Sequence, residues 1–221
     1  MRRKYALSLI IACLGCALIA LVGLSRAPQA PVASAAGKTL HTVYLPLVLK
    51  NAGCGSGTLV RDGGFEASTT GTLNPYWQIT TNIPHTIFDN SLIPAPIPTH
   101  SGTWKAWLGA DNLLQQTLTQ TLTVPAGATS LQIGFWWLVT TADPNPQGFD
   151  TTNIQIRNAA GALQETLYHL SDVDQGVAWA QKIVTATQAY ANQSIQLAFT
   201  TFIDSTFPTS FFIDDVSVTC Q

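Results

Sequence analysis

Two adjacent carboxylates, Asp214 and Asp215, interrupt the otherwise apolar stretch SFFIDDVSVTC at residues 210–220. The stretch predicts a β-strand, in which successive side chains point to opposite faces. Since Phe212 and Val216 share the parity of Asp214, we expect Asp214 to point into the protein and Asp215 to point toward solvent or a loop. A buried carboxylate is costly unless a cation or several hydrogen bonds satisfy it. Asp214 is therefore the first candidate for a site residue.

The sequence lacks the common motifs of hydrolytic enzymes. The chain has two glutamates, Glu66 and Glu165, and no pattern pairs two carboxyl groups as glycoside hydrolysis requires. The histidines lack the spacing of metal ligands, and no G-x-S-x-G nucleophile motif occurs. We therefore expect a protein that is not an enzyme.

Tryptophans offer a second kind of chemistry, because the C–H face of a sugar stacks on a flat ring. In the alternating stretch LQIGFWWLV, Trp136 shares a face with Gln132, while Trp137 shares the face of the apolar residues. Trp104 and Trp107 fall on opposite faces of another strand, so one of them is expected to face outward. We take Trp136, Gln132 and Trp104 as candidate ligand-binding residues. Packing in the core is the alternative for each tryptophan.

The N-terminal residues indicate export. A basic start, MRRK, precedes an apolar run that ends at Leu24 and then a region of small residues, which is the order found in a secretory signal peptide. The stretch IIAC within the run also resembles a lipoprotein cleavage box. The sequence predicts a signal peptide over residues 1–36, a leader over 37–56 and one domain over 57–221. Membrane contact is expected only through an uncleaved N-terminal segment, so the protein is expected to be secreted, extracellular or attached to the cell surface.

The net charge indicates which partners to expect, and the cysteine content indicates the cellular compartment. Without residues 1–36, six Lys and Arg residues stand against 12 acids, which leaves a net charge of about −6. A nucleic acid needs a basic surface, so no nucleic-acid partner is expected. Cys54 and Cys220 remain of the four cysteines. A single pair of cysteines in an exported chain predicts a disulfide.

The sequence pattern from Thr58 onward is typical of an all-β domain. Short alternating segments separated by turn residues predict nine to eleven strands. A helical period is suggested only over 174–190, where a strand and a turn are the alternative. Many short strands with turn signals between them predict a β-sandwich.

Five motifs in order give the sequence a familiar pattern: LVRDGGFE, KAWLGA, LTQTLTVPAGATSLQIGFWW, AYANQSIQLAF and SFFIDDVSV. Together they resemble a bacterial secreted jelly-roll module of the galactose-binding-like superfamily, related to Ca²⁺-dependent carbohydrate-binding modules. The resemblance covers roughly residues 57–219. It implies a β-sandwich jelly roll whose first and last strands are neighbours, with a structural Ca²⁺ held between them. Glu66 lies in the GGFE of the first motif, and Asp214 lies in the IDDV of the last.

Glu66 and Asp214 are accordingly the expected metal ligands, because carboxylates and backbone carbonyls form the oxygen cage that suits Ca²⁺. The alternative is that backbone N–H groups or Arg61 satisfy both acids. The expected function is non-catalytic binding, with a glycan or another cell-surface polymer as the partner. The alternative function is a structural or adhesive module that contacts protein or cell wall and binds no sugar.

Overall fold

The fold is described from a computed structural model, in which residues 54–92 and 97–221 are placed. These residues belong to the unit Leu47–Gln221. The predicted signal peptide and leader residues 37–53 lie outside the described residues. Within the described part of the chain, no helix is long and apolar enough to cross a membrane.

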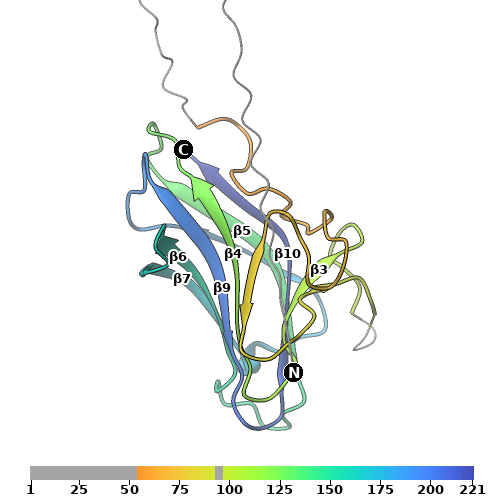
Figure 1. The fold of residues 1–221 in the computed structure, drawn as a ribbon. Coiled ribbons are helices and arrows are strands. Elements are labelled where there is room, and N and C mark those ends of the chain that lie inside the picture. Colours follow the sequence, from red (N-terminus) through yellow and green to blue (C-terminus); the bar gives the residue numbers. More distant parts are fainter. Residues whose placement is uncertain (1–53, 93–96) are drawn as a thin grey trace, which may run out of the picture. The chain divides into compact units, whose positions relative to one another are not determined.

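Ten strands of the described chain form two antiparallel sheets of five strands each, which lie in two layers (Figure 1). The first, which we call the β4 sheet, has the order β1 (Gln78–Thr81), β4 (Gln115–Thr123), β9 (Ser194–Phe202), β6 (Thr151–Asn158) and β7 (Leu163–Ser171). The second, which we call the β10 sheet, has the order β2 (Phe88–Asp89), β3 (Lys105–Gly109), β10 (Thr209–Cys220), β5 (Leu131–Thr141) and β8 (Ala180–Thr185). The prediction of an all-β sandwich is confirmed.

The hydrophobic core lies between the two sheets, where strands such as β4 and β5 bury their inward-facing residues. On β5, Leu131, Ile133, Phe135 and Val139 are all buried, as the alternation in LQIGFWWLV predicts. Across the core, the rings of Phe135 and Phe199 meet edge to face with centroids 6.0 Å apart. Most side chains on the inner faces are therefore apolar, and Gln116 and Gln120 of β4 are among the polar residues that are also buried.

The chain that precedes β1 follows β10 without forming a strand, whereas the sequence predicts a broken strand for TLVRDGGFEAS. The N–H of Leu59 donates to the carbonyl of Val218 at 2.7 Å, and the N–H of Val216 donates to the carbonyl of Gly63 at 2.9 Å. At Gly63 an added Cβ would stand 1.9 Å from the Val216 carbonyl oxygen, so only glycine permits this approach. The two ends of the domain are neighbours, as the resemblance implies.

The predicted disulfide joins these two ends. Cys54 and Cys220 are bonded with their Cα atoms 5.3 Å apart across 166 residues of sequence. Closing a loop of this length restricts the unfolded chain, which contributes up to about 5 kcal/mol in the chain-entropy description. The bond ties the start of the described domain to the last residue of β10.

A β-bulge reverses the alternation of side chains along β10. The pairing of β10 with β5 shifts between Asp214 and Ser217, so β10 has one residue more than its partner there. Within the bulge, Asp215 adopts a left-handed backbone with φ of 47°. The core-facing residues are Ile213 before the bulge and Val216 after it. Asp214 therefore points to the outer face of the β10 sheet, and the expectation that it shares a face with Val216 is wrong.

Residues 174–190 contain the strand and turn that the sequence left as an alternative to a helix. A single turn of 3-10 helix, η1, covers Asp172–Asp174, and β8 begins at Ala180. The side chains of β8 alternate between half-buried and exposed, which is typical of a strand at the edge of a sheet.

Candidate functional site

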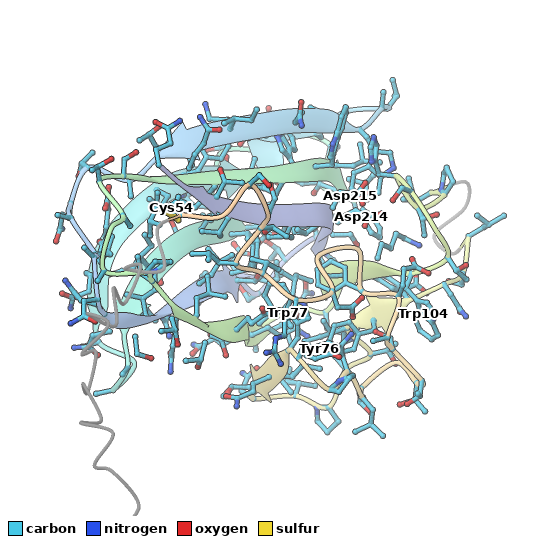
Figure 2. The ribbon with its side chains drawn as sticks, turned by 90° about the horizontal axis from the view of Figure 1, so that it is seen from above. Cys54, Tyr76, Trp77, Trp104, Asp214 and Asp215 are labelled. Atoms are coloured by element: carbon cyan, nitrogen blue, oxygen red, sulfur yellow. A yellow bond between two sulfur atoms is a disulfide. The ribbon has the colours of Figure 1, made fainter. Side chains whose placement is uncertain are left out.

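Asp214 is fully buried although it lies on the outer face of the β10 sheet. The loop between β2 and β3 covers it: the N–H groups of His100 and Ser101 donate to its Oδ2 at 2.9 and 3.2 Å. The N–H of Asp215 donates to Oδ1 at 2.8 Å. Figure 2 shows Asp214 and Asp215 next to each other on the strand. The predicted burial of Asp214 is confirmed, and three backbone amides supply its hydrogen bonds.

Burial raises the pKa of Asp214 from its ordinary 3.8 to about 7. Loss of solvation is the largest cause, and the nearby negative charge of Asp215 acts in the same direction. The backbone N–H donors oppose the shift in pKa without cancelling it. This carboxyl group therefore gains or loses its proton near neutral pH.

Asp215 holds the same loop from the outside. Its Oδ2 lies 2.5 Å from His100 Nδ1, and its Oδ1 accepts a hydrogen bond from Ser101 Oγ at 2.7 Å. The His100 ring stacks on Trp136 with centroids 3.7 Å apart, and it meets the Trp179 ring edge-on at 5.9 Å. Asp215 is peripheral, as predicted, and its histidine partner is 115 residues away in sequence.

Glu66 fixes the other end of the loop. Its Oε1 accepts hydrogen bonds from the N–H groups of Thr103 and Trp104 at 2.8 and 2.9 Å. Both predicted acids lie beside Gly64, where an added Cβ would stand 3.8 Å from Asp214 Oδ1 and 3.9 Å from Glu66 Cγ. The two acids are therefore close together, as expected, and both accept hydrogen bonds from the same loop.

The contacts of these two acids match the hydrogen-bonded alternative. Each carboxylate faces backbone N–H groups, whereas calcium ligation needs converging oxygen atoms. Among the described residues, no group of three or more His, Cys, Asp or Glu side chains is placed to hold a metal ion. Arg61 lies over the ring of Tyr76 instead. As arranged, the two acids face N–H donors, and Ca²⁺ binding by Glu66 and Asp214 stays a prediction.

The three residues predicted to bind a ligand do not form one surface. Trp136 and Gln132 are both half-buried on the outer side of β5, but the His100 ring covers one face of Trp136. Trp104 packs against the core, which is the alternative given for each tryptophan. Trp107 takes the outward position on β3, where it stacks on a phenylalanine of β10.

The outer face of the β4 sheet is a larger surface that carries hydroxyl and amide groups almost throughout. Its outward positions alternate with the buried residues of each strand. We call them the polar face: Gln78 and Thr80 of β1; Gln115, Thr117, Thr119, Thr121 and Thr123 of β4; Gln196, Thr200 and Phe202 of β9; and Thr151, Asn153, Gln155 and Arg157 of β6. None of these positions holds a carboxylate, so the face is nearly uncharged in a chain with an excess of acids.

Two open hollows follow one another along the polar face, each beside an exposed aromatic ring. One, of about 390 Å³, lies at the edge of this face and is lined by Thr121, by Arg61 and by Tyr76, which is 41% exposed and whose ring centroid lies 5.9 Å from the Arg61 guanidinium. The other, of about 430 Å³, is lined by Thr117 and by Phe202, which is 45% exposed. At about 3.4 Å per residue, Thr117 and Thr121 are roughly 14 Å apart along β4. The two hollows therefore lie at different points along β4.

A network around Arg157 orders the polar groups between β6 and β9. Its Nη2 donates to Thr200 Oγ1 at 2.8 Å and to Gln155 Oε1 at 3.0 Å, and its Nε donates to Gln155 Oε1 at 3.2 Å. Thr200 Oγ1 also donates to Gln155 Oε1 at 3.2 Å. These bonds link the polar side chains of β6 and β9 to one another.

Sequence reasoning missed the polar face although a signal for it was present. The outward residues of QQTLTQTLT are all threonine or glutamine, whereas exposed positions often hold Lys, Glu, Arg or Asp. The pattern predicted the strand, but it did not show that β4 pairs with β9 and that β9 pairs with β6. Only this pairing gathers the uncharged positions of three strands on one face.

Comparison with known proteins supports the fold. No protein-family model and no curated protein matches the chain. Among solved structures, the carbohydrate-binding module TmCBM61 in complex with β-1,4-galactotriose is 15% identical, and the match covers 75% of this chain and 100% of that one with a TM-score of 0.52. The K2 cleaved adhesin domain of Lys-gingipain is 14% identical over 72% of this chain and 97% of its own, with a TM-score of 0.48. A family 16 carbohydrate-binding module is 14% identical over 72% and 98%, with a TM-score of 0.41.

The first of these likenesses carries the conclusion about architecture. At such low identity it shows the fold alone: the two antiparallel sheets of this chain match the β-sandwich of that module. The jelly-roll architecture implied by the sequence motifs is thereby confirmed.

Proposed function

We propose that this protein binds carbohydrate without hydrolysing it, and that the polar face holds the sugar chain. The observation that carries the proposal is the pair of hollows, each beside an exposed aromatic ring, on a sheet face of hydroxyl and amide groups. Ligand sites combine apolar contact surface with a few placed polar groups in this way. The likeness in fold to a module in complex with galactotriose supports a carbohydrate as the ligand.

The chemistry of the polar face favours a neutral sugar chain. A sugar ring offers a C–H face, which packs on Phe202, and a rim of hydroxyl groups, which exchange hydrogen bonds with threonine and glutamine side chains. The face lacks carboxylates, and most donors of Arg157 are engaged by Gln155 and Thr200. Binding therefore depends on stacking and hydrogen bonds more than on charge.

The positions of the acids support a non-catalytic role. Glycoside hydrolysis needs two carboxyl groups that flank the bond at separations of about 5 to 10 Å. Glu66 and Asp214 are engaged with the loop on the other sheet. Glu165 accepts hydrogen bonds from Thr187 and from the Tyr190 hydroxyl. These three acids are therefore held by contacts away from the polar face.

Export and a structural Ca²⁺ are further parts of the proposal. The sequence of residues 1–36 supports export and a place of action at or outside the cell surface, with a glycan or another cell-surface polymer as partner. The motifs around Glu66 and Asp214 support Ca²⁺ as a structural ion. A structural or adhesive module without sugar binding is the rival function, and it predicts no response to any glycan.

A glycan array probed with the purified protein tests the proposal, and calorimetry on the best oligosaccharides gives their affinities. We expect binding to one class of neutral glycan and no release of reducing ends on prolonged incubation. Release of reducing ends would contradict the non-catalytic role. An array without any signal, repeated with added Ca²⁺, would favour the structural or adhesive module.

A further inference from the structure

Lys105, at the start of β3, is a fully buried cation on the outer face of the β10 sheet. Its Nζ donates to Asp89 Oδ2 at 2.6 Å and to the carbonyl of Ser91 at 2.8 Å. The ring of Phe212 lies 5.8 Å from Nζ. Asp89 and Lys105 face each other across the antiparallel pair of β2 and β3, so the backbone holds the two side chains together.

The two oxygens of Asp89 are held in different ways. Oδ1 accepts hydrogen bonds from the N–H of Ser91 at 3.0 Å and from its hydroxyl at 2.6 Å. Oδ2 contacts the amine of Lys105. One oxygen thus faces two donors that can stabilise a developing negative charge, and the other lies next to a potential nucleophile. These are the parts of an acyl-transfer site.

We propose that Lys105 and Asp89 condense to an isopeptide bond between Nζ and Cγ, which joins β2 and β3 covalently. The reaction starts inside the ion pair. In the first step a proton passes from Nζ to Oδ2 along their hydrogen bond and leaves a neutral amine beside a neutral carboxyl group.

The amine then attacks Cγ, and Oδ1 takes the negative charge under the two Ser91 donors. A second proton passes from nitrogen to Oδ2, the bond between Cγ and Oδ2 breaks, and Oδ2 leaves as water. One C–N bond forms and one C–O bond breaks. Nothing is oxidised or reduced, and no further reactant is consumed.

The cross-link would anchor both ends of the loop that covers Asp214. Asp89 precedes this loop and Lys105 follows it, and β2 is a strand of two residues that pairs with β3 alone. Condensation replaces two buried charges by a neutral amide, which removes the cost of keeping both charges away from water. The bond therefore stabilises the part of the β10 sheet with the shortest strand.

Tryptic mapping of the folded, full-length protein, after denaturation and reduction, tests the inference. Lys105 is the one Lys or Arg between Arg61 and Arg157, and trypsin does not cleave at a lysine whose amine is acylated. We expect a single peptide, 62–157, with a mass lower than its sequence mass by one water molecule. Complete cleavage into 62–105 and 106–157 at full mass would overturn the inference and leave a buried ion pair.

Two controls locate the lost water. Lys105→Met gives the same long peptide without the amine, so its mass must show no loss of water. Asp62 precedes a glycine and can lose water by cyclising on its own backbone, but that product is still cleaved after Lys105. A water loss that persists in Lys105→Met, or in a wild-type peptide that trypsin cleaves after Lys105, would also overturn the inference. The result is independent of whether the protein binds sugar.

Discussion

Replacement of Asp214 by asparagine should remove a pH dependence of stability that runs opposite to that of most carboxylates. The pKa of Asp214 is about 7 in the folded protein against 3.8 ordinarily, so the folded state holds the proton more tightly than the unfolded state does. Its contribution to stability is fully present below about pH 4, falls as the pH rises, and is lost above about pH 7.

The size of the effect follows from the same two pKa values. At 1.36 kcal/mol per pKa unit, the total loss is up to about 4 kcal/mol, of which about 2 to 3 kcal/mol falls between pH 5 and pH 8. Asparagine carries no titrating group, so the variant should lack this part of the loss. Urea unfolding of wild type and Asp214→Asn at both pH values, followed by tryptophan fluorescence, measures the difference.

Comparison of the two proteins isolates Asp214 from the other acids. Burial also raises the pKa of Asp150, but Asp150 titrates in both proteins and cancels in the difference. Asp215→Asn is the matched control and should keep most of the pH dependence. If the free-energy difference between wild type and Asp214→Asn is the same at pH 5 and pH 8, the argument from burial is refuted.

Two further changes test the surroundings of the same acids. If Ca²⁺ binds at Glu66 and Asp214, chelation should lower the melting temperature, by the equivalent of about 2.7 kcal/mol when the ion is at a hundredfold excess over its Kd. Asp214→Asn should abolish this response, and Asp215→Asn should largely preserve it. A wild-type melting curve that chelation leaves unchanged would contradict calcium binding. Gly63→Ala should destabilise the fold by at least about 2 kcal/mol, because the new Cβ would meet a backbone carbonyl at 1.9 Å. Gly55→Ala, where an added Cβ meets no atom within 4 Å, should have little effect in the same urea unfolding experiment, and equal effects of the two changes would contradict the packing argument.

Alternation and cysteine content predicted much of the architecture. Every second residue of LQIGFWWLV is apolar, which predicted that Phe135 and Val139 lie in the core, because a strand in a sandwich has one face toward the other sheet. The pair Cys54 and Cys220 predicted the disulfide and hence the proximity of the two ends of the domain. Both inferences use rules that hold regardless of the rest of the fold.

The outer surfaces could not be predicted in the same way. The bulge at Asp215 could not be predicted from SFFIDDVSVTC. The residues before it are apolar at odd and even positions alike, so a change of face leaves no mark in the pattern, and no glycine occupies the left-handed position. The contacts from His100 to Asp214 and Asp215 join residues more than 110 positions apart. Alternation shows which way a side chain points along an unbroken strand, but it does not show which loop will cover it.

The central claim is that sugar binds on the polar face of the β4 sheet. Calorimetric titration of the best oligosaccharide into Phe202→Ala, Trp136→Ala and Phe149→Ala tests it most directly, because each variant removes one ring. Phe149 is 59% exposed and lines neither hollow, so it is the matched control for Phe202. The account predicts that Phe202→Ala weakens binding about fivefold or more, equivalent to about 1 kcal/mol for one stacking contact, while the other two variants bind like wild type. Wild-type affinity in Phe202→Ala together with a loss in Trp136→Ala would contradict the account and place the site on the β10 sheet.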